Sequence, residues 1–211
     1  MTTAKSGPRV LITGFEPFPG APVNPTEWLV SRLRETPPSV ERMGAFRAET
    51  LPVSYQAVGL RLSEIGRAFR PDIAIHFGLA QACKGFRLER FARNRFVASH
   101  ADNLGFVPAS GPICAGPETL ASSLPLAAIH GSLEAAGLPV EWSDDAGGYL
   151  CNTVFTLSLA RAVDDFHPTM SGFVHVPSLT PSSSVGFGDD LFLAGVDLVI
   201  WNCVAAFLAA K

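Results

Sequence analysis

The chain has 211 residues, of which 47% are hydrophobic and 17% are charged, and its formal net charge is −3. This apolar, weakly charged composition is typical of a globular protein and excludes an intrinsically disordered chain. The small negative charge gives no reason to expect a polyanionic partner, so we expect no nucleic-acid binding. The length fits a single domain over residues 1–211, with ample apolar material for a core.

The cysteines predict a reduced, cytoplasmic protein. None of the four belongs to a C-x-x-C pair, and their spacing matches neither a disulfide framework nor a zinc site: Cys83, Cys114, Cys151 and Cys203. The N-terminus lacks the apolar region of a signal peptide. The most apolar segment, residues 191–210, is interrupted by Asp197 and Asn202. We therefore expect a buried C-terminal helix there and no membrane span.

The first half of the chain predicts alternating strands and helices. Residues 9–15 form a short apolar run that is typical of a strand. Asn24 and Pro25 have the chemistry of a helix cap and a first helical residue. A second strand is predicted over residues 46–53, after which Ser54 is expected to cap a helix that Pro71 stops.

A third strand over residues 72–78 is apolar enough to lie in the centre of a sheet. The order strand, helix, strand, helix, strand indicates an α/β sandwich with a mostly parallel sheet. Ligands of such folds bind beyond the carboxyl ends of the strands. We therefore expect the segments that follow Phe15 and Gly78 to border a site.

The second half is less regular. Residues 84–103 suggest one or two strands, with an added hairpin as one arrangement, and a helix is predicted from Pro117 to about Ala136. Strands are expected over residues 140–142 and 171–177, and residues 181–184 are expected to form a loop. The basic cluster in this half is interpreted as a solvated edge or loop, and its members are Arg87, Arg90, Arg93 and Arg95.

Residues 144–155 turn from a polar, glycine-rich segment into an apolar, helix-compatible run, and Cys151 lies at the transition. A helix N-terminus favours the thiolate, which is the nucleophilic form of cysteine. Its unpaired N–H groups could also stabilise an oxyanion. The alternative is that Cys151 is a small apolar filler.

A cysteine nucleophile needs a base, and histidine has a suitable pKa. Of the five histidines, His175 is favoured because it lies near the end of a predicted strand, on the rim expected to carry Cys151, and His100 is the alternative. An acid is needed to orient the imidazole. Position in the sequence does not choose among four carboxylates: Glu16, Glu89, Asp102 and Asp145.

Three segments give the chain a resemblance to the pyroglutamyl peptidase I family, also called pyrrolidone carboxyl peptidases. They are the N-terminal segment 13–18 followed by Asn24-Pro25, the cysteine segment 145–152 and the histidine segment 172–177. The resemblance implies a three-layer α/β/α fold, neither metal nor cofactor, a cytoplasmic location and a homo-oligomer (dimer or tetramer). It also implies the removal of N-terminal pyroglutamate from peptides.

The resemblance implies a Glu-Cys-His triad. The segment Glu89-Arg90-Phe91-Ala92-Arg93-Asn94 matches the family's context for the acid, so Glu89 joins Cys151 and His175. Phe15 and Phe18 match aromatic residues that line the pyrrolidone pocket, to which we also assign Leu79 and Leu150.

Two departures concern the pocket. Leu79 replaces a glutamine that helps to frame it in the family, and Ser99-His100-Ala101 stands where an Arg-Ile-Pro run is usual. Arg93 or Arg95 could substitute for that arginine. These departures leave two alternatives: a hydrolase of another small cyclic or N-acyl amide, and a catalytically silent binding protein on the same fold.

Overall fold

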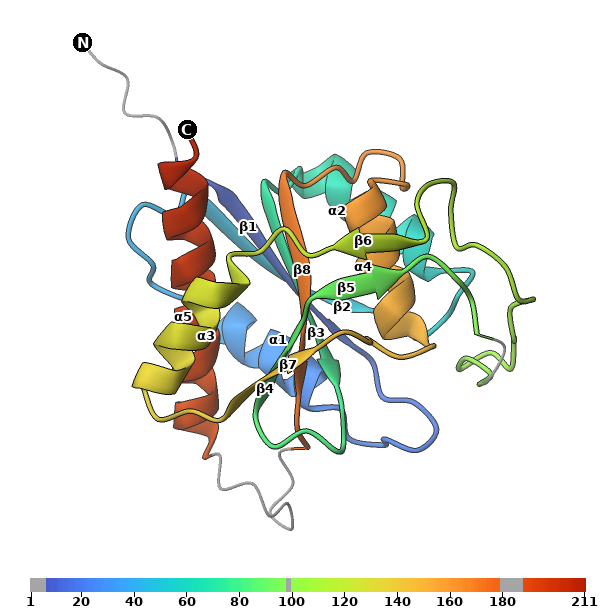
Figure 1. Cartoon of the computed structure of the whole chain (residues 1–211), viewed down its shortest axis with the longest axis horizontal. Helices are drawn as coiled ribbons and strands as arrows, with labels where there is room; N and C mark the ends of the chain where they lie inside the picture. Colours follow the sequence, from blue (N-terminus) through green and yellow to red (C-terminus); the bar gives the residue numbers. More distant parts are fainter. Residues whose placement is uncertain (1–6, 98–99, 179–187) are drawn as a thin grey trace.

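A six-stranded sheet forms the middle of the computed structural model, which describes residues 7–97, 100–178 and 188–211 (Figure 1). Its strand order is β2-β1-β3-β8-β4-β7. The strands are β1 (Arg9–Phe15), β2 (Ala45–Leu51), β3 (Ile73–Leu79), β4 (Phe86–Glu89), β7 (Val140–Ser143) and β8 (Met170–Val176). Strands β2, β1, β3 and β8 are parallel, whereas β4 runs antiparallel to β8 and parallel to β7. The predicted mostly parallel sheet is therefore confirmed.

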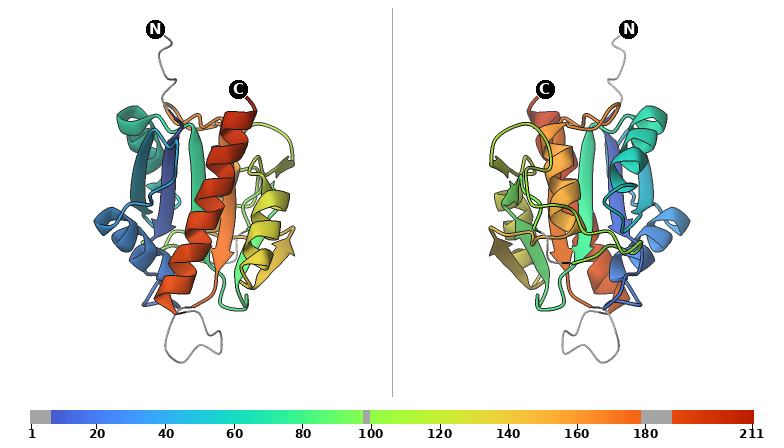
Figure 2. Two further views of the ribbon diagram at one scale, coloured as in Figure 1. Left: turned by 90° about the vertical axis from the view of Figure 1, so that its left-hand side faces the viewer. Right: turned by 90° about the vertical axis from the view of Figure 1, so that its right-hand side faces the viewer.

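Helices cover both faces of this sheet. They are α1 (Pro25–Glu35), α2 (Val58–Phe69), α3 (Leu126–Ala135), α4 (Leu150–Ala160) and α5 (Asp189–Ala209). Apolar side chains of α1, α3 and α5 pack in one core cluster, and those of α2 and α4 in a second. Figure 2 shows α5 across one face of the sheet and α4 across the opposite face. This arrangement confirms the predicted three-layer α/β/α sandwich.

Helix α5 corresponds to the predicted C-terminal helix. Its length and composition would suffice to cross a membrane, but half of its most apolar window is buried within the fold. Phe192, Val199 and Phe207 lie in the core cluster that also holds α3 side chains. The packing confirms the predicted burial of this helix.

The N-terminus of α1 follows its predicted chemistry, but that of α2 does not. Asn24 Oδ1 accepts the Thr26 N–H at 3.0 Å, and Pro25 is the first helical residue. Helix α2 begins only at Val58, after Ala57, and no side chain of the described residues caps it. The predicted Ser54 cap is wrong, because the Ser54 backbone carbonyl accepts the Val58 N–H in a turn that precedes the helix.

The predicted helix from Pro117 is also wrong at its start. Strand β6 (Thr119–Ala121) occupies this segment and pairs antiparallel with β5 (Phe91–Arg93). Its backbone hydrogen bonds go to β5, which excludes a helix, and α3 begins only after Pro125. Two strands do form among the described residues of 84–103, but β4 joins the main sheet and β5 joins the small one, so they do not form a hairpin with each other.

Candidate active site

Cys151 is the second residue of α4, at the carboxyl-end edge of the sheet. The residue before the helix, Tyr149, provides no side-chain cap. The first N–H groups of α4 thus receive no cap from this residue and lie at the positive end of the helix dipole. Gly147 sets the approach to this helix with a φ of 82°, and its N–H donates to Asp145 Oδ1 at 2.9 Å. A side chain at Gly147 would be strained in this conformation.

His175 and Glu89 form a buried pair on adjacent strands. The Nδ1 atom of His175 lies 2.8 Å from Glu89 Oε1. Glu89 is completely buried, and its other oxygen, Oε2, has no hydrogen-bond partner within the described ranges. An ionised carboxylate this deep in a protein is stable only when it is paired. Its contact with Nδ1 fixes the imidazole so that Nε2 is left to act elsewhere.

The His175 side chain also hydrogen-bonds to Cys151. Burial lowers the pKa of His175, but the charge of Cys151, the hydrogen bond to it and the Glu89 carboxylate together outweigh burial and raise this pKa to about 9. The imidazole is thus protonated at neutral pH, opposite the sulfur. A neighbouring imidazolium is the environment that activates a cysteine nucleophile.

Gly78 provides the space that the sulfur occupies. It is the register partner of His175 between β3 and β8. A Cβ atom at Gly78 would lie 2.9 Å from Cys151 Sγ and 2.7 Å from the ring of Phe173. Because the Phe173 ring is buried and close-packed, a larger residue could enter only by displacing the ring or the thiol. Gly78 is a site residue that the sequence marked only as the end of a strand.

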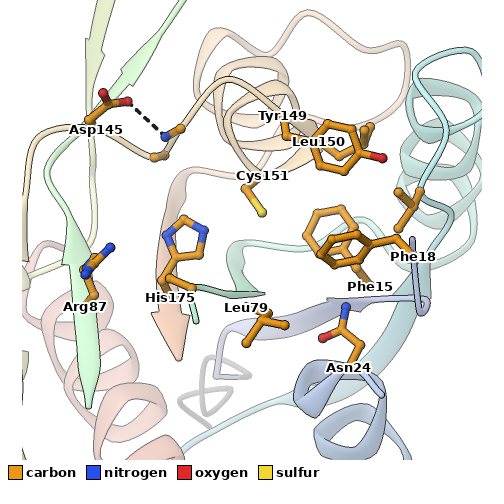
Figure 3. A pocket seen from close by; sticks show the side chains of 14 residues that line it. Phe15, Phe18, Asn24, Leu79, Arg87, Asp145, Tyr149, Leu150, Cys151 and His175 are labelled. Atoms are coloured by element: carbon orange, nitrogen blue, oxygen red, sulfur yellow. Dashed lines mark hydrogen bonds between the residues drawn. The ribbon is translucent and has the colours of Figure 1, made fainter. Parts of the chain in front are cut away.

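A cavity of about 270 Å³ opens beside Cys151 (Figure 3). All four residues predicted to line a substrate pocket do line it: Phe15, Phe18, Leu79 and Leu150. Cys151 and His175 line it as well. The structure adds several residues that the sequence did not indicate, among them Asn24, Val53, Arg87 and Tyr149. Figure 3 shows the aromatic rings, with Leu79 and Asn24, on one side of the sulfur, and the charged side chains of Arg87 and Asp145 on the other.

Aromatic rings build the apolar side. The Phe18 and Tyr149 ring centroids are 5.9 Å apart, and Tyr55 packs edge-on against Tyr149 at 5.8 Å. Asp102 holds the loop behind them, because its carboxylate accepts the N–H groups of Tyr55 and Phe106. Asp102, a candidate for the acid, is thus engaged with backbone and lies outside the set of residues that line the cavity.

The other candidate acids and bases lie away from the sulfur or outside the triad. Glu16 is exposed, and Asp145 lines the cavity but binds the Gly147 N–H. His76 is completely buried in β3 and contacts Thr13 Oγ1 at 2.7 Å, as expected for a core histidine. The His100 ring lies 6.2 Å from that of Tyr149. Ser99, like the predicted loop 181–184, lies outside the described residues.

The four thiols occupy different environments. Burial raises the pKa of Cys83 to about 11, and it raises that of Cys203 further still. Burial also raises the pKa of Cys114, although this thiol is partly exposed. Cys151 is partly exposed too, and it alone of the four lines the cavity beside a protonated histidine. The geometry thus distinguishes this thiol from the others.

The basic cluster divides into two parts. Arg90 is exposed and forms a two-point ion pair with Asp144, as a solvated edge predicts. Arg93 contacts Asp144 and Asp145 from a half-exposed position. Arg87 differs, because only 26% of its side chain is exposed and it lines the cavity. The strand pattern could have indicated this, since Arg87 lies two residues before Glu89 and therefore on the same face of β4.

The chain matches a family model described as pyroglutamyl peptidase over residues 8–190. The chain belongs to the pyroglutamyl peptidase family. Its relatives include a pyrrolidone-carboxylate peptidase of Pyrococcus furiosus, 38% identical over 172 residues that cover 80% of each chain. A pyrrolidone-carboxylate peptidase of Vibrio vulnificus is 32% identical over 204 residues, which cover 93% of this chain and 92% of the relative.

Solved structures show the same fold. The pyrrolidone carboxyl peptidase of Thermococcus litoralis superposes with a TM-score of 0.85 at 29% identity and covers 97% of this chain and 96% of its own. The pyrrolidone carboxyl peptidase of Thermus thermophilus gives a TM-score of 0.79 at 32% identity, and the match covers 92% of this chain and 99% of that one. The family resemblance and the assignment as a cysteine peptidase of the hydrolase class are confirmed. The roles of individual residues in this chain stay a prediction.

Proposed function

We propose that this protein removes N-terminal pyroglutamate from peptides through Cys151, His175 and Glu89. The observation that carries the proposal is the arrangement of a partly exposed thiol at a helix N-terminus, hydrogen-bonded to a histidine that a buried carboxylate orients. The same arrangement argues against a silent binding protein, because a buried carboxylate that orients a histidine beside a partly exposed thiol is the geometry of an activated nucleophile.

In the first step, the Cys151 thiolate attacks the carbonyl carbon that joins pyroglutamate to the next residue. The tetrahedral oxyanion is stabilised by backbone N–H groups at the start of α4, each of which contributes about 10²–10³ in rate. The His175 imidazolium then gives its proton to the leaving nitrogen as the C–N bond breaks. The products are a thioester on Cys151 and a peptide with a free amine.

In the second step, neutral His175 takes a proton from water, and the resulting hydroxide equivalent attacks the thioester. Pyroglutamate leaves, and the thiolate–imidazolium pair is restored. Glu89 keeps the Nδ1 proton in place throughout, so that Nε2 carries out both transfers.

The apolar side of the cavity favours a flat, uncharged acyl group. Phe15, Phe18 and Tyr149 provide aromatic surface on which a lactam ring can pack. Asp145 is the one carboxylate among the lining residues, and Figure 3 shows it across the sulfur from these rings. A free N-terminal ammonium would be desolvated without a partner there, which disfavours ordinary amino termini.

The test compares a pyroglutamyl fluorogenic amide with prolyl and alanyl amides for wild type, Cys151→Ala and Cys114→Ala. Cys114 is the matched control because it is the other partly exposed thiol. We expect hydrolysis of the pyroglutamyl amide alone, its loss in Cys151→Ala and its retention in Cys114→Ala. Wild-type turnover by Cys151→Ala would contradict the assignment.

A second candidate is hydrolysis of another small cyclic or N-acyl amide, and Leu79 is the observation that favours it. This apolar side chain lines the cavity at the position where the family usually has a glutamine. It offers no hydrogen bond to a lactam. The candidate predicts that an N-acyl or prolyl amide outpaces the pyroglutamyl amide in the same assay.

We also propose a cytoplasmic location and a homo-oligomer, dimer or tetramer. A nucleophilic thiol has to stay reduced, which the cytoplasm ensures. Exposed apolar side chains on α5, Leu191 at 53% and Trp201 at 52%, support association. Light scattering of wild type and Trp201→Glu measures the oligomeric state, and a monomeric wild type would contradict the proposal.

A further inference from the structure

Arg87 lies beside the catalytic histidine because of strand pairing. Strands β4 and β8 are antiparallel, and Arg87 is the register partner of His175. Directly paired side chains on such strands lie on the same face of the sheet, with Cβ atoms about 5 Å apart. This pairing places the guanidinium in the cavity on the far side of His175 from Phe15 and Phe18 (Figure 3).

The Arg87 guanidinium has N–H donors that its ion pair with Glu141 does not use. Its Nε donates to Glu141 Oε1 at 2.5 Å, and this ion pair holds the side chain at the edge of the cavity. Within the described parts of the chain, Nη1 and Nη2 have no hydrogen-bond partner. Only a quarter of the side chain is exposed, so solvent screens these donors less than it would on an open surface. Arginine binds carboxylates through such paired donors.

The position of Arg87 corresponds to the leaving-group side of the reaction. The acyl ring packs on the aromatic side of Cys151, and His175 protonates the leaving nitrogen on the other side. One residue of extended chain spans about 3.3–3.6 Å. The residue whose nitrogen leaves therefore carries its α-carboxylate or its side chain past His175 and toward the Arg87 guanidinium.

We propose that Arg87 selects substrates in which the residue after pyroglutamate bears a carboxylate. This inference rests on the proposed function and specifies its substrate class. Two sources supply the same chemistry: the C-terminal carboxylate of a dipeptide and an acidic side chain at that position. The one carboxylate among the lining residues, Asp145, accepts the Gly147 N–H and pairs with Arg93, so it is engaged elsewhere.

The experiment measures kcat/KM for two matched pairs of substrates by release of pyroglutamate. Pyroglutamyl-alanine against its C-terminal amide tests the α-carboxylate. Pyroglutamyl-aspartyl amide against pyroglutamyl-asparaginyl amide tests the side chain. We expect wild type to prefer the acid of at least one pair by about tenfold, since a hydrogen bond to a charged group is among the stronger ones.

Three variants assign the preference. Arg87→Ala is expected to bring the acid-to-amide ratio close to one, and Arg87→Lys to keep part of it, because the charge remains and the paired geometry is lost. Arg90→Ala is the matched control, an arginine on the same segment that pairs with Asp144 outside the cavity. It should leave the ratio unchanged. Using a ratio within each variant cancels any general loss of activity.

Glu141→Gln separates selection from a structural role. If Arg87 served only to pair with Glu141, this variant and Arg87→Ala would lose thermal stability alike and neither would alter the ratio. We expect Glu141→Gln to keep or increase the ratio, because a competing negative charge is removed. Equal rates on acids and amides in wild type would overturn the inference and leave the proposed function standing. Failure to hydrolyse any of the four compounds would overturn both.

Discussion

Two buried histidines lie on neighbouring strands of this protein and are in opposite states. His76 in β3 is completely buried, and burial lowers its pKa to about 3. His175 in β8 is nearly as buried, yet its pKa is raised to about 9. Their rings are linked through one residue, because Phe173 stacks on His76 and packs with a tilted ring against His175. Burial therefore accounts for the state of His76 but not for that of His175.

The difference arises from the partners of each imidazole, and the largest contribution that raises the pKa of His175 comes from Cys151. His76 Nδ1 contacts the neutral hydroxyl of Thr13, whereas His175 Nδ1 contacts the carboxylate of Glu89. A neutral partner leaves the desolvation penalty on the imidazolium uncompensated, whereas the interactions of His175 with Cys151 and Glu89 outweigh it. One histidine is thus a core residue and the other an acid–base group, and the following changes test this contrast from the largest effect to the smallest.

His175→Gln removes the proton donor and the positive charge beside the sulfur. We expect kcat/KM for a pyroglutamyl amide to fall by about 10⁴-fold, at the upper end of what general acid–base catalysis contributes. Alkylation of Cys151 by iodoacetamide at pH 7 should slow as well. Equal alkylation rates in wild type and variant would show that His175 does not activate the thiol.

Glu89→Gln keeps the shape of the triad and removes its negative charge. We expect kcat/KM to fall by about 10²–10³-fold and its alkaline limb to move to lower pH. The sign follows from the raised pKa: the imidazolium is present below about 9, and losing the carboxylate lets it deprotonate earlier.

The same change affects stability. A pKa raised by folding stabilises the fold fully below the unfolded value of about 6.5, and this contribution is lost as the pH rises through 9. Urea unfolding of Glu89→Gln should therefore show less alkaline destabilisation than wild type between pH 7 and 9. An unchanged pH profile of both activity and unfolding would contradict the role of Glu89.

Gly78→Ala places a methyl group against Cys151 Sγ and Phe173. We expect a roughly 10- to 100-fold loss of kcat/KM, because the thiol is displaced, and a loss of about 1–3 kcal/mol in the free energy of unfolding. Gly59→Ala is the control, since a Cβ atom at that helical glycine meets nothing within 4 Å. Wild-type activity in Gly78→Ala would show that the Phe173 ring can move to admit the methyl group without displacing the thiol.

His76→Gln should have the smallest effect on activity and a distinct effect on acid stability. Wild type keeps His76 neutral when folded, whereas the unfolded chain protonates it below about pH 6.5. Stability therefore falls, by about 1.4 kcal/mol per pH unit from this group, as the pH drops from 6.5 toward 3.

Replacing His76 by glutamine removes that slope, which urea unfolding at several pH values measures. His167→Gln provides the comparison, because His167 is exposed. Equal slopes in wild type and His76→Gln would mean that His76 is protonated within the fold.

Much of the fold could be predicted from the sequence, because many of its helices and strands depend on local patterns of residues. The apolar strands, the Asn24 cap and the cysteine at a helix start are each determined by neighbouring residues. The short strands β5 and β6 were harder, since residues 119–121 become extended only through pairing with residues 91–93, distant in the chain. The false cap at Ser54 had the right residue type, but a turn separates it from the helix.

Site residues could be predicted from the sequence only where they lie in a motif that the family shares. Position in the sequence alone left four acids open, and only the family resemblance singled out Glu89, which the structure places against His175. The sequence did not indicate Arg87, and it placed Gly78 at the border of a site but not against the sulfur of Cys151. Both positions depend on strand register: Arg87 is paired with His175 across β4 and β8, and Gly78 across β3 and β8. Register is set by tertiary packing, which no single stretch of sequence contains.

The different environments of the four thiols should allow selective chemical labelling of Cys151. Cys83 and Cys203 are buried, with pKa values raised well above neutrality, and burial raises that of Cys114 as well. An electrophile offered at pH 7 and in equal amount should therefore modify the protein once, at Cys151. Such a reagent would titrate the active sites and so give the fraction of protein molecules in a preparation that carry a reactive Cys151. It could also carry a dye or crosslinker to the mouth of the pocket without any engineered cysteine.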